Sequence, residues 1–345
     1  MKAAFITDLM LALALGPTRI GAQLFPPEMP GAVAESPASS KPLHVYFIGN
    51  SVTDTLKYGA FAQAAQQMGS PVTWGRQMIP GSPLFWLWRA AEQKPQDCGF
   101  MEPPFGGSIQ ALRDFPWDVV TLQPFDRLLD NADPKEGDDQ GDVLYCQKYL
   151  DLVLQRSPEA QVYVHARWPR MLVKGKSIDF DKDAYDKPTP GKTADWSQVD
   201  PFGQRWLAKY TGGWDTSNET ADYFETLTRI LRNVNPKIGK PVLLIPVGHV
   251  MFELDKRMQS GDLPGYKGIY DVYKDAIHLT DAGAYIVGCT FYSTLFRKDP
   301  QGFPGEPYHV SDPKLMALVQ ETVWRVVSVH PLAGVAPQEK IKQGF

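Results

Sequence analysis

The chain has 345 residues, of which 43% are hydrophobic and 21% charged, and its formal net charge is -4 at pH 7. These are ordinary values for a folded globular protein, and they exclude a disordered or fibrous chain. No run of the sequence is rich in Lys and Arg, so the basic surface expected of a nucleic-acid-binding protein is missing. The length suits one large α/β domain, or one domain with a long insertion, better than two separate domains.

The amino terminus resembles a secretory signal peptide. Lys2 precedes a short apolar run that ends near the small residues Gly21 and Ala22, and this run is too short to cross a membrane. We therefore expect residues 1–22 to be a signal peptide and the protein to be secreted or periplasmic; an amphipathic or disordered amino terminus is the alternative. Residues 23–42 are rich in Pro, Ala and Ser, which predicts a flexible lead-in. No later segment reaches the ~18 apolar residues of a membrane span.

From Leu43 onward, short apolar runs alternate with segments of helical periodicity. Runs bounded by Gly or Pro predict strands at 43–49, 71–78, 117–123, 160–168 and 240–248. Helical periodicity predicts helices at 57–69, 147–157, 221–234 and 281–296. The strands are apolar almost throughout, as in parallel sheets covered on both faces. This pattern predicts a doubly wound, flavodoxin-like three-layer α/β/α domain at 43–330 with a mostly parallel five-stranded sheet, followed by a tail at 331–345.

Two segments are too long for simple connections between a strand and a helix. Residues 124–145 carry an acidic stretch, and the insertion at 169–217 contains Trp196, Trp206 and Trp214. Long loops in compact domains are usually lids or binding loops, so substrate specificity is expected to reside in these two segments.

The three cysteines are Cys98, Cys146 and Cys289, and their spacing excludes a structural zinc site of the CxxC type. Cys98 and Cys146 could pair in an oxidising compartment, and this question stays open. Cys289 lies in an apolar stretch and is expected to be a core residue.

The first chemical signal is the segment FIGNSVTD at 47–54. Ser51 follows a predicted buried strand and precedes helical sequence, so its hydroxyl is expected on a tight turn beside amides that can stabilise an oxyanion. The alternative is that Ser51 or Thr53 only caps the next helix.

The second signal is KDAIHLTDAGAY at 274–285. If this segment makes a single turn, Asp275 can hold the Nδ1 proton of His278 while Nε2 faces a serine. A surface histidine beside a capping aspartate is one alternative, and a pair of metal ligands is another. No third or fourth ligand at a compatible spacing is evident in the sequence, so we expect no metal and no cofactor.

Together these two signals resemble the SGNH (GDSL) hydrolase superfamily, in which a serine follows the first strand and a D-x-x-H unit near the carboxyl end supplies the acid and the base. The resemblance extends from about Leu43 to Phe296. It implies a Ser51-His278-Asp275 triad and an oxyanion hole formed by the amides of Ser51 and Gly81 and by a side-chain amide. Gln123, in WDVVTLQPF, stands where the family usually has Asn. In this the chain resembles a carbohydrate-esterase-like branch of the family, and the position of the third donor is in doubt.

The resulting expectation is a secreted serine esterase that acts on carboxylic esters, with an O-acetyl group on a carbohydrate as the favoured substrate. A lipase or broad small-ester esterase, an acyltransferase, and a non-catalytic carbohydrate-binding protein are the alternatives. No nucleic-acid partner and no membrane span are expected, and the oligomeric state is left open. Candidate substrate-binding residues are Arg167 and Trp168, at the strand end where doubly wound folds bind ligands, and Trp206 and Trp214, because aromatic faces suit the C–H faces of sugars.

Overall fold

The structure is a computed structural model that describes residues 41–130, 141–176, 196–236 and 239–335. All of them belong to one compact unit. The predicted signal peptide, nearly all of the lead-in, and parts of both long segments lie outside the described residues. Within that part of the chain, the strands are β1 (Leu43–Gly49), β2 (Val72–Met78), β3 (Phe100–Met101), β4 (Val119–Leu122), β5 (Gln161–His165) and β6 (Leu243–Ile245).

The strands form one sheet in the order β3-β2-β1-β4-β5-β6. The five predicted strands pair in parallel, which confirms the doubly wound arrangement. The sheet has six strands rather than five, because β3 adds an antiparallel edge beside β2. β3 has only two residues, too few for an alternating or apolar pattern to predict it.

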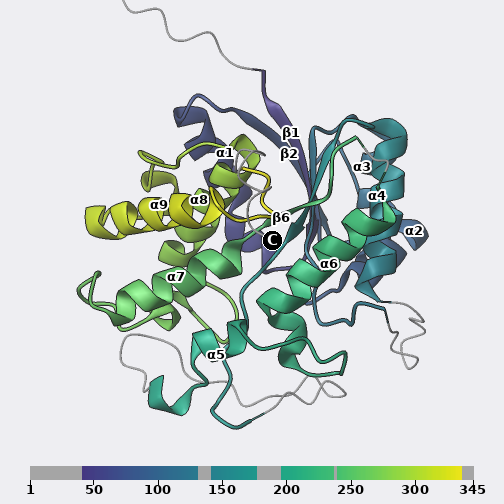
Figure 1. The fold of residues 1–345 in the computed structure, drawn as a ribbon. Coiled ribbons are helices and arrows are strands. Elements are labelled where there is room, and N and C mark those ends of the chain that lie inside the picture. Colours follow the sequence, from purple (N-terminus) through teal and green to yellow (C-terminus); the bar gives the residue numbers. More distant parts are fainter. Residues whose placement is uncertain (1–40, 131–140, 177–195, 237–238, 336–345) are drawn as a thin grey trace, which may run out of the picture. The chain divides into compact units, whose positions relative to one another are not determined.

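Helices cover both faces of the sheet (Figure 1). Their bounds are α1 (Tyr58–Gln67), α2 (Leu84–Gln93), α3 (Ser108–Asp114), α4 (Asp142–Arg156), α5 (Phe202–Trp206), α6 (Ala221–Val234), α7 (Val247–Gln259), α8 (Asp281–Phe296) and α9 (Pro313–Val327). Short 3₁₀ helices are η1 (Thr53–Leu56), η3 (Trp196–Gln198), η4 (Thr216–Glu219), η5 (Ile269–Val272) and η6 (Glu306–Tyr308). One layer contains α1, α7, α8 and α9, and the other contains α2, α3, α4 and α6. The predicted three-layer α/β/α fold is confirmed.

The central strands are apolar because both of their faces are covered. Successive side chains of β1 point to opposite faces: the Tyr46 ring lies 5.0 Å from the Trp117 ring, whereas the Phe47 ring lies 4.9 Å from the ring of Tyr58 in α1 and 6.1 Å from that of Phe291 in α8. Burial on two faces explains why the sequence shows a continuous apolar run here rather than alternation.

Helix α8 is apolar around its whole circumference, because it packs between the sheet and α9. Its Cys289 is fully buried, as expected for a core residue. Cys98 and Cys146 are also buried, and all three cysteines are free thiols. Among the described helices, none combines the length and hydropathy that crossing a bilayer requires.

The packed chain continues beyond residue 330. Leu332 and Ala333 are buried, and the Leu332 carbonyl accepts a 2.9 Å hydrogen bond from the Leu244 amide in β6. The described parts of the 169–217 insertion are packed as well, since α5 lies against α7 and a β-bridge joins Val173 to Val199.

Candidate active site

Ser51 lies on a tight turn at the carboxyl end of β1. The Asn50 carbonyl accepts from the amides of Thr53 at 3.0 Å and Asp54 at 3.3 Å, and the Asn50 side chain accepts from the Val52 amide at 3.0 Å. Gly49 is needed just before this turn, because a Cβ there would lie 2.1 Å from the Thr53 hydroxyl. The chain therefore reverses sharply after the strand and leaves Ser51 partly exposed, as the sequence predicted.

Gln123, which directly follows β4, forms hydrogen bonds with this turn. Its Oε1 accepts from the Asn50 amide at 3.3 Å and from the Thr53 hydroxyl at 3.0 Å, while its Nε2 donates to the Pro124 carbonyl at 2.6 Å. The side chain is fully buried. Both ends of the amide bind protein atoms, so Gln123 supports the serine turn. Its role as the third oxyanion donor stays a prediction.

The amides of Ser51 and Gly81 are the two main-chain oxyanion donors that the family resemblance predicts. Within the described part of the chain, neither the Ser51 amide nor the Gly81 amide donates a hydrogen bond. Gly81 has φ of +67°, a conformation that favours glycine. The Asn50 side chain donates to the Ser82 carbonyl at 3.1 Å, which ties the turn after β1 to the turn that contains Gly81.

Asp275 and His278 lie on a short closed loop that leads into α8. A β-bridge joins Tyr273 to Leu279, and the Lys274 amide donates to the His278 carbonyl at 2.9 Å. Asp275 Oδ1 accepts from the amides of Ile277 and His278 at 2.9 and 2.7 Å. The three-residue spacing thus makes the single turn that the sequence predicted.

The loop brings the imidazole of His278 to Ser51. His278 Nε2 lies 2.9 Å from Ser51 Oγ, and His278 Nδ1 lies 2.8 Å from Asp275 Oδ2. The hydroxyl and the imidazole are 227 residues apart in sequence. This chain of contacts has the geometry of a nucleophile, a base and an acid that orients the base.

The surroundings favour the ionised form of Asp275. Partial burial alone raises the pKa of this carboxyl, but hydrogen bonds from the Ile277 and His278 amides and from the imidazole outweigh it and hold the pKa below its usual value. A negative charge beside Nδ1 stabilises a positive charge on His278, so the arrangement can assist proton removal from Ser51.

Arg167, expected to bind substrate, is instead fully buried in an ion-pair network. Its guanidinium lies 3.2 Å from both Asp126 and Glu219, and Glu219 also pairs with Arg170 and Arg205. The network joins the end of β5 to the 169–217 insertion, and the expectation that Arg167 lines a binding surface is wrong.

Trp168 and Trp206 are also fully buried, so neither offers a face to substrate. The Trp168 indole donates to the Ile277 carbonyl at 2.7 Å and supports the loop that carries His278. The Trp206 ring lies against the rings of Phe224 and His249. Burial of large aromatic side chains is common in anchored insertions, and the sequence alone could not separate this role from substrate binding.

Trp214 is exposed, as a substrate-binding residue must be. Its side chain is 37% exposed, and it lies 5.7 Å from the guanidinium of Arg127, which lies 5.6 Å from the ring of Trp86. Trp86 is 42% exposed. We call Trp86 and Trp214, with the buried Arg127 between them, the aromatic platform; the sequence pointed to neither Trp86 nor Arg127.

The sequence matches no family model and no curated protein. Among solved structures, the chain is similar to a DUF4886 family protein from Bacteroides uniformis, with 15% identity over 83% of this chain and 94% of that one and a TM-score of 0.49. It is similar to the lipopolysaccharide acetyltransferase periplasmic domain of Salmonella Paratyphi A, with 12% identity over 74% and 84% and a TM-score of 0.38. It is also similar to a possible lipase from Chitinophaga pinensis, with 11% identity over 76% and 100% and a TM-score of 0.38. None of these identities is high enough to transfer an activity to this chain.

Proposed function

We propose that this protein is a serine esterase of the SGNH type, in which Ser51 is the nucleophile, His278 the general base and acid, and Asp275 the group that orients it. The observation that carries the proposal is the pair of contacts made by the His278 ring, at 2.9 Å to Ser51 Oγ and 2.8 Å to Asp275. Without an adjacent base, a serine hydroxyl is a poor nucleophile.

In the first half of the reaction, His278 Nε2 takes the Ser51 proton as Oγ attacks the ester carbonyl. The resulting tetrahedral oxyanion accepts hydrogen bonds from the amides of Ser51 and Gly81. Collapse of this intermediate breaks the bond to the alcohol, which takes the proton from His278 and leaves an acyl-Ser51. In the second half, His278 takes a proton from water, the hydroxide attacks the acyl group, and the acid leaves as Ser51 regains its proton.

We propose a carbohydrate O-acetyl ester as the substrate. Parallel strands β2, β1 and β4 are neighbours in the sheet, and the chain beyond their carboxyl ends contains Trp86, Ser51 and Arg127, respectively. Trp86 and Arg127 therefore belong to segments that flank the Ser51 turn, and Trp214 of the insertion joins them through its contact with Arg127. Exposed indole faces suit sugar rings. Export to a secreted or periplasmic location is part of the same proposal.

The experiment that tests the esterase proposal is steady-state hydrolysis of p-nitrophenyl esters from acetate to decanoate. We expect turnover that is highest for acetate and is abolished in Ser51→Ala. The matched control is Ser260→Ala, an exposed serine that bonds only near its own helix end, and it should retain full activity. Equal background rates for wild type and Ser51→Ala contradict the proposal, and a preference for long acyl chains favours a lipase.

A further inference from the structure

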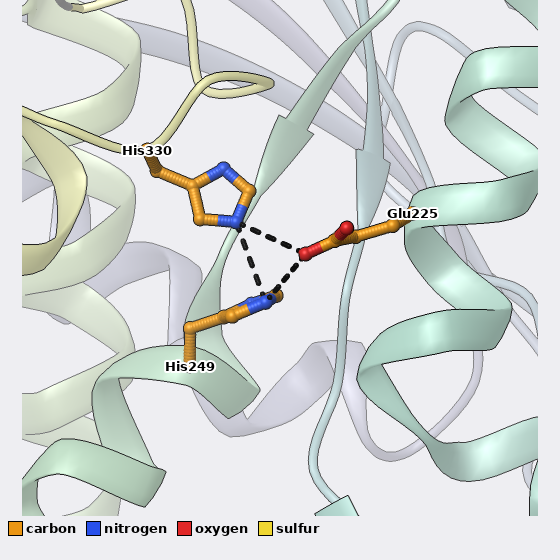
Figure 2. Close-up of side chains that lie close together, drawn as sticks. All are labelled: Glu225, His249 and His330. Atoms are coloured by element: carbon orange, nitrogen blue, oxygen red, sulfur yellow. Dashed lines mark hydrogen bonds and ion pairs between the residues drawn. The ribbon is translucent and has the colours of Figure 1, made fainter. Parts of the chain in front are cut away.

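A second cluster of polar side chains lies away from the triad, on three elements that are distant in sequence. Glu225 comes from α6, His249 from the first turn of α7, and His330 from the turn that follows α9. Figure 2 shows that both imidazole rings direct a nitrogen toward the Glu225 carboxylate. The sequence gives no spacing signal for this cluster, because His330 is 81 residues from His249 and 105 from Glu225.

The distances within this cluster match those between ligands of one metal ion. Glu225 Oε1 lies 3.0 Å from His249 Nε2 and 3.7 Å from His330 Nε2, and the two Nε2 atoms are 3.3 Å apart. Ligand atoms about 2.0–2.1 Å from a tetrahedral Zn²⁺ lie about 3.3–3.4 Å from one another. The three atoms therefore occupy one face of such a tetrahedron, and the fourth position remains for water.

The surroundings hold these ligands in place and leave a route for an ion. The Trp206 ring meets the His249 ring edge-on at 5.0 Å, and Arg229 binds the other Glu225 oxygen at 2.7 Å, which leaves Oε1 for the cluster. The side chains of His249 and Glu225 are 18% and 23% exposed, whereas that of His330 is 7% exposed. A hydrated ion can thus approach from the side of Glu225.

The cluster is a poor hydrogen-bond network when it holds no cation. The Leu332 amide donates to His330 Nδ1 at 3.2 Å, so the proton of neutral His330 is on Nε2. His249 Nδ1 is buried and has no hydrogen-bond partner among the described residues. Two Nε2 protons then converge on one carboxylate oxygen. Coordination through both Nε2 atoms moves each imidazole proton to Nδ1, at the cost of the bond from the Leu332 amide, and metal binding should therefore shift the turn at 330–332.

We propose that Glu225, His249 and His330 bind one divalent transition-metal ion of the Zn²⁺ class. Two imidazoles and one carboxylate are a ligand set typical of Zn²⁺. Because His330 lies beyond α9 and next to the strand contact made by Leu332, the ion joins the carboxyl-terminal segment to α6 and α7. This proposal does not depend on the esterase activity.

The test is metal binding by tag-free, chelator-stripped protein, measured by calorimetry with ZnCl₂. We expect one equivalent of Zn²⁺ and a higher Tm. His249→Ala, His330→Ala and Glu225→Gln should each weaken binding by more than ~10-fold, given that loss of even a group that only orients a ligand costs ~10–100-fold. The matched control is His309→Asn, which replaces an exposed histidine at φ of +58° by a residue that tolerates this conformation, and it should bind as wild type does.

X-ray absorption of the Zn²⁺-loaded wild type gives a readout that needs no variant. The proposal predicts two imidazole nitrogens at ~2.0–2.1 Å in a four-coordinate shell with oxygen. It is overturned if Zn²⁺ does not bind, if the His249 and His330 variants bind it unchanged, or if the absorption spectrum shows fewer than two imidazoles.

Discussion

The indole nitrogen of Trp168 donates a 2.7 Å hydrogen bond to the main-chain carbonyl of Ile277. This contact joins the end of β5 to the loop that holds Asp275 and His278. Met171, three residues further along, donates from its amide to the Ala276 carbonyl at 2.7 Å. The loop that carries the proposed base is therefore fixed by the segment after β5, and not only by its own turn.

Trp168→Phe should lower kcat several-fold and reduce the free energy of unfolding by about 1–3 kcal/mol, because it leaves the Ile277 carbonyl without its donor. The measurement is p-nitrophenyl acetate turnover together with urea denaturation. Trp206→Phe is the matched control, since Trp206 is equally buried but its indole nitrogen has no hydrogen-bond partner among the described residues. If Trp206→Phe slows turnover as much as Trp168→Phe, Trp168 does not act through the loop.

Asp275→Asn should lower kcat by ~10³–10⁴, because an amide cannot hold His278 in the required tautomer or stabilise its positive charge. Since the pKa of Asp275 is held below its usual value, the acid stays ionised well below neutral pH in the wild type. The variant should keep its circular-dichroism spectrum and its KM nearly unchanged. A loss below 10-fold would remove Asp275 from the mechanism.

The variant Gln123→Ala distinguishes between two roles of Gln123, support of the serine turn and direct hydrogen bonding to the oxyanion. The truncation leaves the Asn50 amide, the Thr53 hydroxyl and the Pro124 carbonyl without a partner, so we expect both kcat and Tm to fall. Thr53→Val, which removes one of these bonds, should reproduce part of the loss in kcat. A loss of ~10²–10³ in kcat at unchanged Tm, together with a silent Thr53→Val, would instead show that Gln123 binds the oxyanion itself.

Glu219→Gln should destabilise the fold by about 3–5 kcal/mol, because it leaves buried guanidinium groups of Arg167, Arg170 and Arg205 without this counter-charge. Burial alone raises the pKa of Glu219, but the three arginines outweigh it and hold the pKa below its ordinary value. The stabilisation is then complete above the ordinary glutamate pKa of ~4.3 and is lost as the pH falls toward the lowered value.

Urea denaturation between pH 7 and pH 3 measures this dependence. The wild type should lose stability through the acidic range, and Glu219→Gln should lose less over the same range. Glu253→Gln alters surface ion pairs with Lys256 and Arg325 and should change stability by less than about 1 kcal/mol. Identical pH dependence in wild type and Glu219→Gln would contradict the account of the network.

Trp86→Ala and Trp214→Ala should each raise KM for O-acetylated oligosaccharides while leaving p-nitrophenyl acetate turnover unchanged, because the platform holds the sugar and not the acyl group. Each stacked ring is worth about 1 kcal/mol or more, so several-fold changes are expected in acetate-release assays. Leu207→Ala is the control, because Leu207 is an exposed apolar residue of the 169–217 insertion that also contains Trp214. Unchanged KM in both tryptophan variants would remove the platform from substrate binding.

The sheet was predictable from sequence because β1, β4 and β5 are buried on both faces and carry nearly continuous apolar runs. The serine turn and the Asp275–His278 loop were predictable because each is local, with its geometry set by a few neighbouring residues such as Gly49. Contacts between distant elements were not predictable. An exposed binding residue can also follow a strand or lie in an insertion, so position in the sequence did not reveal that tertiary packing buries Arg167, Trp168 and Trp206. The cluster of Glu225, His249 and His330 has no local spacing signal at all.

The most direct test of the central claim is covalent labelling with a fluorophosphonate, followed by intact-mass and peptide analysis. The account predicts one adduct per chain, on Ser51, formed rapidly by the wild type, much more slowly by His278→Ala and not at all by Ser51→Ala. Labelling at another residue, or equal labelling rates in wild type and His278→Ala, would contradict it.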